Sequence, residues 1–214
     1  MKVTGRRKAT IWAAAIAGVA GPVLFASVLV VLTIFQYDFM LGIGWRPLAD
    51  PAGAWPSGLA LGPYGSVQIL DFVVSGVLLM VFAVGLHFAV TDGRGSRVGP
   101  SLLFVAGTAM ALMGFETDPI RRTTPRTLHG WIHDLAFVLF ALTLLSALFF
   151  LWQRLRKDPH WRNHSHYTLA TGILAALVLV LPGVAYYLFL VVVLLWVGAT
   201  GAKLWRSTVG GDEE

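Results

Sequence analysis

The sequence predicts an all-α, polytopic membrane protein, a bundle of six transmembrane helices that forms a single domain over residues 1–214. Hydrophobic residues make up 57% of the chain and charged residues only 13%, whereas roughly a quarter of the residues in soluble domains are charged. Apolar runs of about 18 residues or more recur along the chain, which is the length at which a helix can cross a bilayer. These runs do not alternate with polar residues, which favours helices over a closed barrel.

The expected spans are roughly 9–36, 66–90, 98–115, 126–153, 166–181 and 183–205. The first apolar run is about twice as long as a signal-peptide core and no cleavage site closes it, so we interpret it as a retained anchor. Asp118-Pro119 after the third span is expected to begin a turn. The fourth span is expected to begin with Thr124 as N-cap and Pro125 at the first helical position. The last two spans are expected to form a tight hairpin around Pro182-Gly183.

The distribution of basic residues predicts the orientation. If both termini are cytoplasmic, twelve of the 16 Lys and Arg residues fall on the inner side. The other four, Arg46, Arg121, Arg122 and Arg126, fall on the outer side. Because Lys and Arg concentrate on the cytoplasmic side of membrane helices, we expect a multi-pass protein of the cell membrane, specifically of a bacterial plasma membrane. The formal charge of +5 is then explained by the basic residues that flank the spans on the cytoplasmic side. We expect membrane lipids as partners and no nucleic acid.

One segment between two apolar spans is polar and carries the candidate site. From Phe115 to Asp134 it contains three carboxylates, three arginines and two histidines. His129 and His133 are four residues apart, so a helix places them on one face. An H-x-x-x-H pair can supply two ligands to one metal ion, and a neutral imidazole can also act as a general base. The structural alternative, in which both histidines bond to neighbouring helices, stays open.

A carboxylate in the second span extends this candidate site. Asp71 lies one to two turns from the outer end of its helix, and Gln68 and Ser75 fall on the same face. A carboxylate in the hydrocarbon is costly and normally has a partner. His129, His133 or an outer arginine are the candidates, so a structural ion pair is an alternative to a catalytic role for Asp71.

The outer arginines have two interpretations. Arg121, Arg122 and Arg126 can pair with Glu116 and Asp118 and fold the loop onto itself. Alternatively they hold a phosphate or carboxylate headgroup, with Gln68 as a further ligand-binding residue, because guanidinium suits such anions. His87 is excluded from this site because it lies about 24 Å along the helix from Asp71.

Several pieces of the chain together resemble a known family. They are Leu59–Gln68, Phe72 with Gly76, Phe82–Leu86, Gly99-Pro100, Phe115 to Asp118-Pro119, and Thr127–Gly130 with His133. In these pieces the chain resembles a family of bacterial and archaeal six-span membrane proteins known as a domain of unknown function, the 998 family. The resemblance implies six helices and the importance of Asp118, His129 and His133. Members of that family carry asparagine where this chain has Asp71, and the resemblance implies no known activity.

These observations leave several function classes open. In the first, an intramembrane enzyme such as a lipid hydrolase or transferase uses Asp71, Asp118, His129 and His133 as catalytic residues and as ligands of a divalent metal such as zinc. In the second, a non-catalytic accessory or binding subunit holds a lipid headgroup or small molecule at the outer face. A transporter built as a homo-oligomer and a haem carrier rank behind these two. Thiolate metal sites and disulfides are excluded because the chain has no cysteine.

Overall fold

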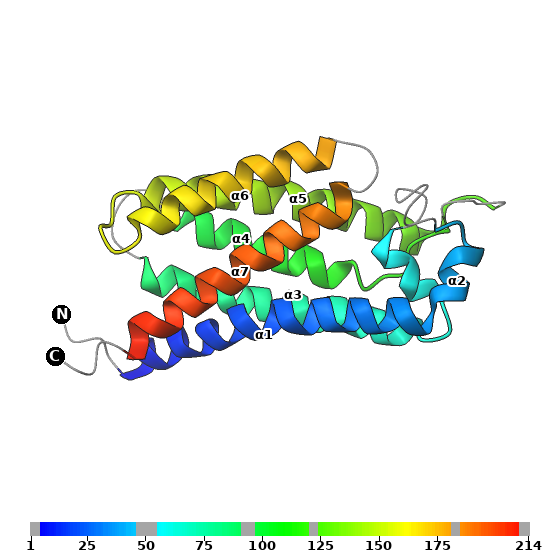
Figure 1. Cartoon of the computed structure of the whole chain (residues 1–214), viewed down its shortest axis with the longest axis horizontal. Helices are drawn as coiled ribbons and strands as arrows, with labels where there is room; N and C mark the ends of the chain where they lie inside the picture. Colours follow the sequence, from blue (N-terminus) through cyan, green and yellow to red (C-terminus); the bar gives the residue numbers. More distant parts are fainter. Residues whose placement is uncertain (1–4, 46–54, 91–96, 120–123, 181–184, 210–214) are drawn as a thin grey trace.

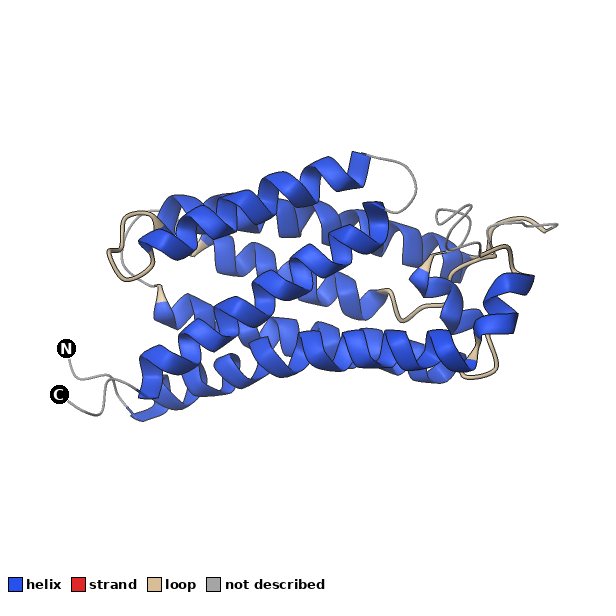
Figure 2. Cartoon of the chain, in the orientation of Figure 1, coloured by secondary structure: helices blue, strands red, loops and turns tan. Residues whose placement is uncertain are grey.

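A computed structural model shows the chain as an elongated helical bundle (Figures 1 and 2). The structure describes residues 5–45, 55–90, 97–119, 124–180 and 185–209, and this part of the chain contains no strand. Its helices are α1 (Gly5–Phe35), α2 (Tyr37–Gly42), the short 3₁₀ helix η1 (Pro56–Leu61), α3 (Gly65–Ala89), α4 (Val98–Leu112), α5 (Leu128–Leu155), α6 (Arg162–Val180) and α7 (Ala185–Val209). The all-α prediction is confirmed.

Several of these helices suit a membrane. Within the described residues, four helices are long and apolar enough to cross one: α1, α3, α5 and the part of α7 from Tyr187 to Thr208. α4 is a shorter apolar helix of 15 residues. The chain therefore has the apolar helices of a membrane protein.

The long helices lie where the sequence placed its spans, within about four residues at each end. α2 and η1 were not predicted, because six-residue helices carry no periodic apolar signal of their own. The predicted hairpin at Pro182-Gly183 lies outside the described residues. α1 continues through Pro22 as one helix.

The six long helices pack as a ring in the order α1, α3, α4, α5, α6, α7 and back to α1 (Figure 1). α1 begins and α7 ends at one end of the bundle, which we call the terminal end. α2 and η1 lie at the opposite end, which we call the α2 end (Figure 1). Side chains fill the inside of the ring, and the rings of Phe140 on α5 and Phe189 on α7 meet there edge to face with centroids 6.4 Å apart.

Glycines allow the closest helix contacts in this ring. At the α1–α7 crossing, a Cβ atom added to Gly201 would lie 2.7 Å from the carbonyl carbon of Gly18. At the α3–α4 crossing, a Cβ atom on Gly76 would lie 2.6 Å from the carbonyl oxygen of Gly107. In lipid, helix association depends on such close packing because the tails around a helix are as apolar as its side chains. These contacts fix the ring that surrounds the site.

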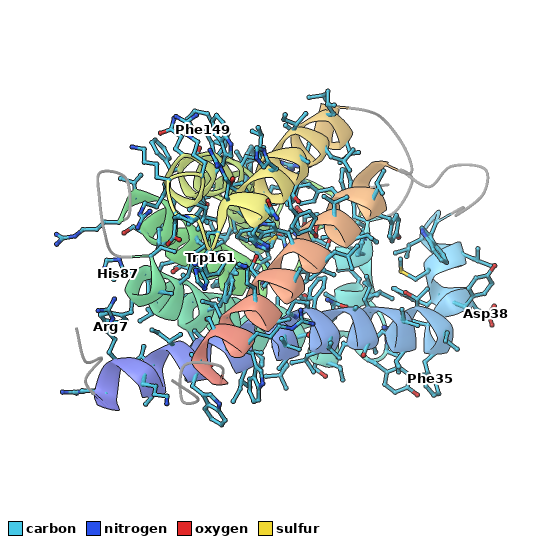
Figure 3. The ribbon with its side chains drawn as sticks, turned by 60° about the vertical axis from the view of Figure 1, so that its left-hand side comes forward. Arg7, Phe35, Asp38, His87, Phe149 and Trp161 are labelled. Carbon is cyan, nitrogen blue, oxygen red and sulfur yellow. The ribbon has the colours of Figure 1, made fainter. Side chains whose placement is uncertain are left out.

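At the terminal end, two arginines bind the last carbonyl groups of α3. Arg7 donates from Nε and Nη2 to the Phe88 carbonyl oxygen at 3.2 and 2.6 Å. The buried Arg154 donates from Nε to the Val90 carbonyl oxygen at 3.2 Å. The final carbonyls of a helix lack partners inside it, and cationic donors suit them. Arg7 and His87 lie at this end, far along the bundle from Asp38 (Figure 3), so His87 stays outside the candidate site.

The α1–α7 crossing can be tested with two glycines of one helix. We expect Gly201→Ala to lower the free energy of unfolding by about 1–2 kcal/mol, since its methyl group would overlap backbone that cannot move aside. Gly198 has open space around its Cβ position, so Gly198→Ala should be neutral or stabilise the helix by up to about 1 kcal/mol. Denaturant titration of both variants in detergent measures the difference. Equal stability would contradict the close crossing.

Candidate functional site

His133 on α5 is a polar side chain at the α2 end that is held by hydrogen bonds to two backbone carbonyl groups. It is buried, with 5% of its surface exposed. Its Nδ1 atom lies 2.9 Å from the carbonyl oxygens of both Met113 and Phe115. Because both partners can only accept, Nδ1 carries the proton and donates. In the neutral form of the ring, this arrangement leaves the lone pair of Nε2 to accept a hydrogen bond from another group.

The end of α4 explains why this hydrogen bond is needed. The last carbonyl groups of a helix have no partner inside it, and Met113, which follows α4, is buried. A buried backbone carbonyl group without a partner is costly. His133 supplies that partner to Met113 and Phe115. Its ring is also fixed edge to face against Phe72 of α3, with centroids 6.0 Å apart.

A second contact network fixes the start of α5. Thr127 donates from Oγ1 to Asp118 Oδ1 at 2.8 Å and from its backbone N–H to Asp118 Oδ2 at 3.1 Å. The same Thr127 oxygen accepts from the Gly130 N–H at 3.0 Å and is thus the N-cap. The predicted cap at Thr124 is wrong, because Asp118 binds Thr127 and the helix starts at Leu128. A Cβ atom on Gly130 would lie 2.2 Å from Asp118 Oδ2, so glycine is needed there.

The remaining residues of the polar segment lie toward the surface. His129 is exposed, and its ring rests against Phe115 with centroids 5.7 Å apart. Arg126 forms an ion pair with Asp134 and places its guanidinium 4.6 Å above the Trp131 ring. Arg126 was expected to pair with Glu116 or Asp118. It pairs instead with Asp134, which lies on α5 about two helical turns further along the chain. Arg121 and Arg122 lie outside the described residues.

The face of α3 predicted to be polar is buried inside the bundle. Gln68, Asp71 and Ser75 are exposed by 0%, 3% and 4%. Ser75 donates from Oγ to Asp71 Oδ1 at 3.2 Å. Asp71 Oδ2 and both polar atoms of the Gln68 side chain have no hydrogen-bond partner within the described residues. A buried polar atom without a partner costs about 1–3 kcal/mol, so these atoms need an explanation.

η1 closes the α2 end over this polar face. The buried Gln36 at the end of α1 donates from Nε2 to the Leu59 carbonyl oxygen at 3.2 Å. Its Oε1 atom accepts from the Tyr64 N–H at 3.3 Å. Sequence reasoning missed Gln36 and Ser57, although a glutamine at the end of an apolar run is the kind of signal that marks a helix terminus bound to a neighbouring segment.

Two adjoining cavities lie inside the ring. The first, which we call the α2-end cavity, has a volume of about 40 Å³ and is lined by His133, Ser57 and Phe72 among others. The second, which we call the central cavity, has a volume of about 50 Å³, and Ser75 is the only polar residue among the described residues that line it. Both are bordered by Phe25, Met110, Phe140 and Leu190. Asp71 is bonded to Ser75 but is not itself among the lining residues of either cavity.

The predicted metal ligands are not gathered into one centre. Asp71 and His133 are buried, whereas His129 is exposed and Asp118 holds Thr127. In the part of the chain that the structure describes, no group of three or more His, Asp or Glu side chains is placed to hold a metal ion. What the α2 end does bring together is a set of hydrogen-bonding groups around a narrow cavity.

Comparison with known proteins gives one match. The sequence model of a family described as "Protein of unknown function (DUF998)" matches residues 19–203, which include every element from the middle of α1 to the last turns of α7. No curated protein and no solved structure matches the chain.

The role of His133 in holding the end of α4 can be tested by two substitutions. We expect His133→Leu to lower the free energy of unfolding by about 1–3 kcal/mol, because the carbonyl groups of the buried Met113 and of Phe115 lose their donor. His133→Asn keeps a donor near the position of Nδ1 and should lose less than half as much. Thermal unfolding in detergent compares the two variants. An Asn variant as unstable as the Leu variant would contradict this role.

Proposed function

The chain belongs to the DUF998 family, and we propose that it is a six-span membrane protein that binds the polar head of a lipid or small amphipathic molecule. In this proposal α4 and α6 cross the membrane with the four longer helices, and both termini are cytoplasmic. The α2 end then faces outward. The distribution of Lys and Arg along the sequence supports this orientation, because twelve of the 16 lie in the segments that this topology assigns to the cytoplasm.

One observation carries the binding proposal: the buried polar groups of Gln68 and Asp71 that have no protein partner. Three such atoms lie on one face of α3 within the described chain, and the same face carries Ser75, which lines the central cavity. Buried polar groups in proteins are almost always hydrogen-bonded. A ligand head that donates and accepts hydrogen bonds would supply the partners that these atoms lack.

A purely structural role explains these residues less well. Structural polar groups such as Gln36, Arg154 and His133 Nδ1 each bind a backbone carbonyl of another element. Gln68 binds no such group in the described chain, and Asp71 binds only the serine of its own helix. Sites that bind ligands commonly retain groups that destabilise the protein alone, since function and stability compete there.

This proposal makes a prediction that a structural role does not. We expect Gln68→Leu and Asp71→Leu to raise the free energy of unfolding of the ligand-free protein by about 1–3 kcal/mol, because each removes buried atoms without partners. Both variants should lose the small molecule or lipid that native mass spectrometry detects on the wild-type protein purified from membranes. Ser66→Leu is the control, because Ser66 is exposed on the same helix and its change should leave ligand binding intact.

The opposite result would overturn the proposal. If both leucine variants are destabilised and retain the bound molecule, Gln68 and Asp71 are structural residues. If the wild-type protein carries no bound molecule and takes up none from a lipid extract, the α2 end does not bind a ligand.

The proposed orientation can be tested with single cysteines, since the chain has none of its own. Thr124 and Asn163 are exposed residues at opposite ends of the bundle. An impermeant maleimide added to intact cells should label Thr124→Cys, and it should label Asn163→Cys only after the membrane is permeabilised. The reverse pattern would contradict cytoplasmic termini.

A further inference from the structure

The two cavities adjoin each other, one with polar lining residues at the α2 end and one with an almost entirely apolar lining. Four side chains border both cavities. The polar lining residues are His133 and Ser57 in the first and Ser75 in the second. The rest of the central cavity is lined by apolar side chains such as Leu79, Val193 and Val197. This sequence of surfaces matches a molecule with a polar head and an apolar tail.

The volumes restrict the tail to one short chain. A cavity holds one water-sized group for about each 10–15 Å³ of this kind of volume. The cavities measure about 40 and 50 Å³, so together they hold about six to nine groups of this size, the polar head included. That space accepts part of a single alkyl chain and excludes the paired chains of a glycerophospholipid. Water would not fill the apolar part, because apolar cavities of this kind stay dry.

The polar groups restrict the head. His133 Nδ1 is committed to two carbonyl oxygens, which leaves Nε2 to accept. Ser75 donates to Asp71, so its oxygen also has only acceptor capacity left, and Asp71 Oδ2 lacks a partner in the described chain. Among the described residues, no Lys or Arg lines either cavity. Apart from the Ser57 hydroxyl and Nε2 of Gln68, these groups accept hydrogen bonds, so they suit a head that donates, and they disfavour a carboxylate or phosphate.

We propose that the α2 end binds a single-chain amphiphile whose head is a primary amine or a hydroxyl group and whose alkyl tail enters the central cavity. This inference rests on the proposed function, which it narrows to a ligand class. The head lies among His133, Ser57 and Ser75, and the tail lies between α1 and α7. Arg126 takes no part, because Asp134 and Trp131 engage its guanidinium.

A series of small amphiphiles tests the head and the tail separately. The full-length protein is reconstituted in phosphatidylcholine nanodiscs, and competition with tritiated octan-1-amine is measured for butan-1-amine, octan-1-ol, octanoic acid and dodecan-1-amine. Affinity in terms of free aqueous concentration should rise about fourfold for each methylene group that is buried. It should then level off beyond about nine carbons, where the cavities end. Partition into the bilayer alone would keep rising without this plateau.

The head chemistry gives a second readout in the same series. Octan-1-amine and octan-1-ol should compete, and octanoic acid should bind at least tenfold more weakly at neutral pH. Equal or tighter binding of octanoic acid would overturn the proposed head. Comparison of the amine with the alcohol shows whether Asp71 takes part as a carboxylate, since only the amine gains a charge pair.

Two alanines of α1 provide a matched pair for the tail. Ala17 lines the central cavity and is buried, whereas Ala20 is exposed on the same helix. Ala17→Leu should reduce the affinity for octan-1-amine to that for butan-1-amine, and Ala20→Leu should leave both unchanged. If Ala17→Leu does not fold, octan-1-amine with a diazirine at its tail replaces it: the wild-type protein should be labelled at residues such as Leu194 and Val197. Labelling confined to lipid-facing residues such as Val23 and Val30 would overturn the inference.

The outcomes separate this inference from the proposed function. If butan-1-amine competes, loses affinity in Gln68→Leu, and longer chains add nothing, the polar site stands and the tail cavity is refuted. If no amine or alcohol competes and the protein still carries a bound molecule that Gln68→Leu abolishes, the ligand class is wrong. If no molecule binds in any assay, both proposals fail.

Discussion

The α2 end of this protein depends on one constraint: a polar group buried in the bundle must find its partner within the protein. α4 ends at Leu112, and the buried Met113 follows it. The carbonyl groups of Met113 and Phe115 lie beyond that helix, and the Nδ1 proton of His133 satisfies both. That bond fixes α5 against the end of α4 and places the His133 ring on the cavity wall. The rest of the site is arranged around this anchored ring.

The same constraint separates structural polar groups from candidate functional ones. Arg7 and Arg154 bind the end of α3, Gln36 binds η1, and Asp118 binds the first turn of α5 through Thr127. Each of these side chains forms a hydrogen bond with a backbone or N-cap group that lacks a partner within its own helix. In the described chain, the side chains of Gln68 and Asp71 form no hydrogen bond outside their own helix. The close glycine crossing of α3 with α4 helps to keep such costly groups buried in the bundle.

The helices could be predicted from sequence because 18-residue apolar runs have few alternatives in a membrane. The polar face of Gln68, Asp71 and Ser75 could be predicted as well, since helical spacing alone places them together. The hydrogen-bond partners of His133 could not be predicted, because they are backbone carbonyl groups, which every residue has. The cap of α5 was misplaced by three residues, since the Asp118 contact that selects Thr127 joins segments nine residues apart. η1 and the cavities arise only when several helices meet.

The central claim is that the head of a ligand forms the hydrogen bonds that the buried side chains of Gln68 and Asp71 lack. An experimental density map of the protein purified from its native membrane, at a resolution that shows side chains and ordered waters, tests it most directly. The account predicts elongated non-protein density whose polar end lies within about 3.2 Å of His133 Nε2 or Asp71 Oδ2 and whose other end enters the central cavity. A map in which Gln68 and Asp71 bond to each other or to protein groups, with the cavities closed, would contradict it.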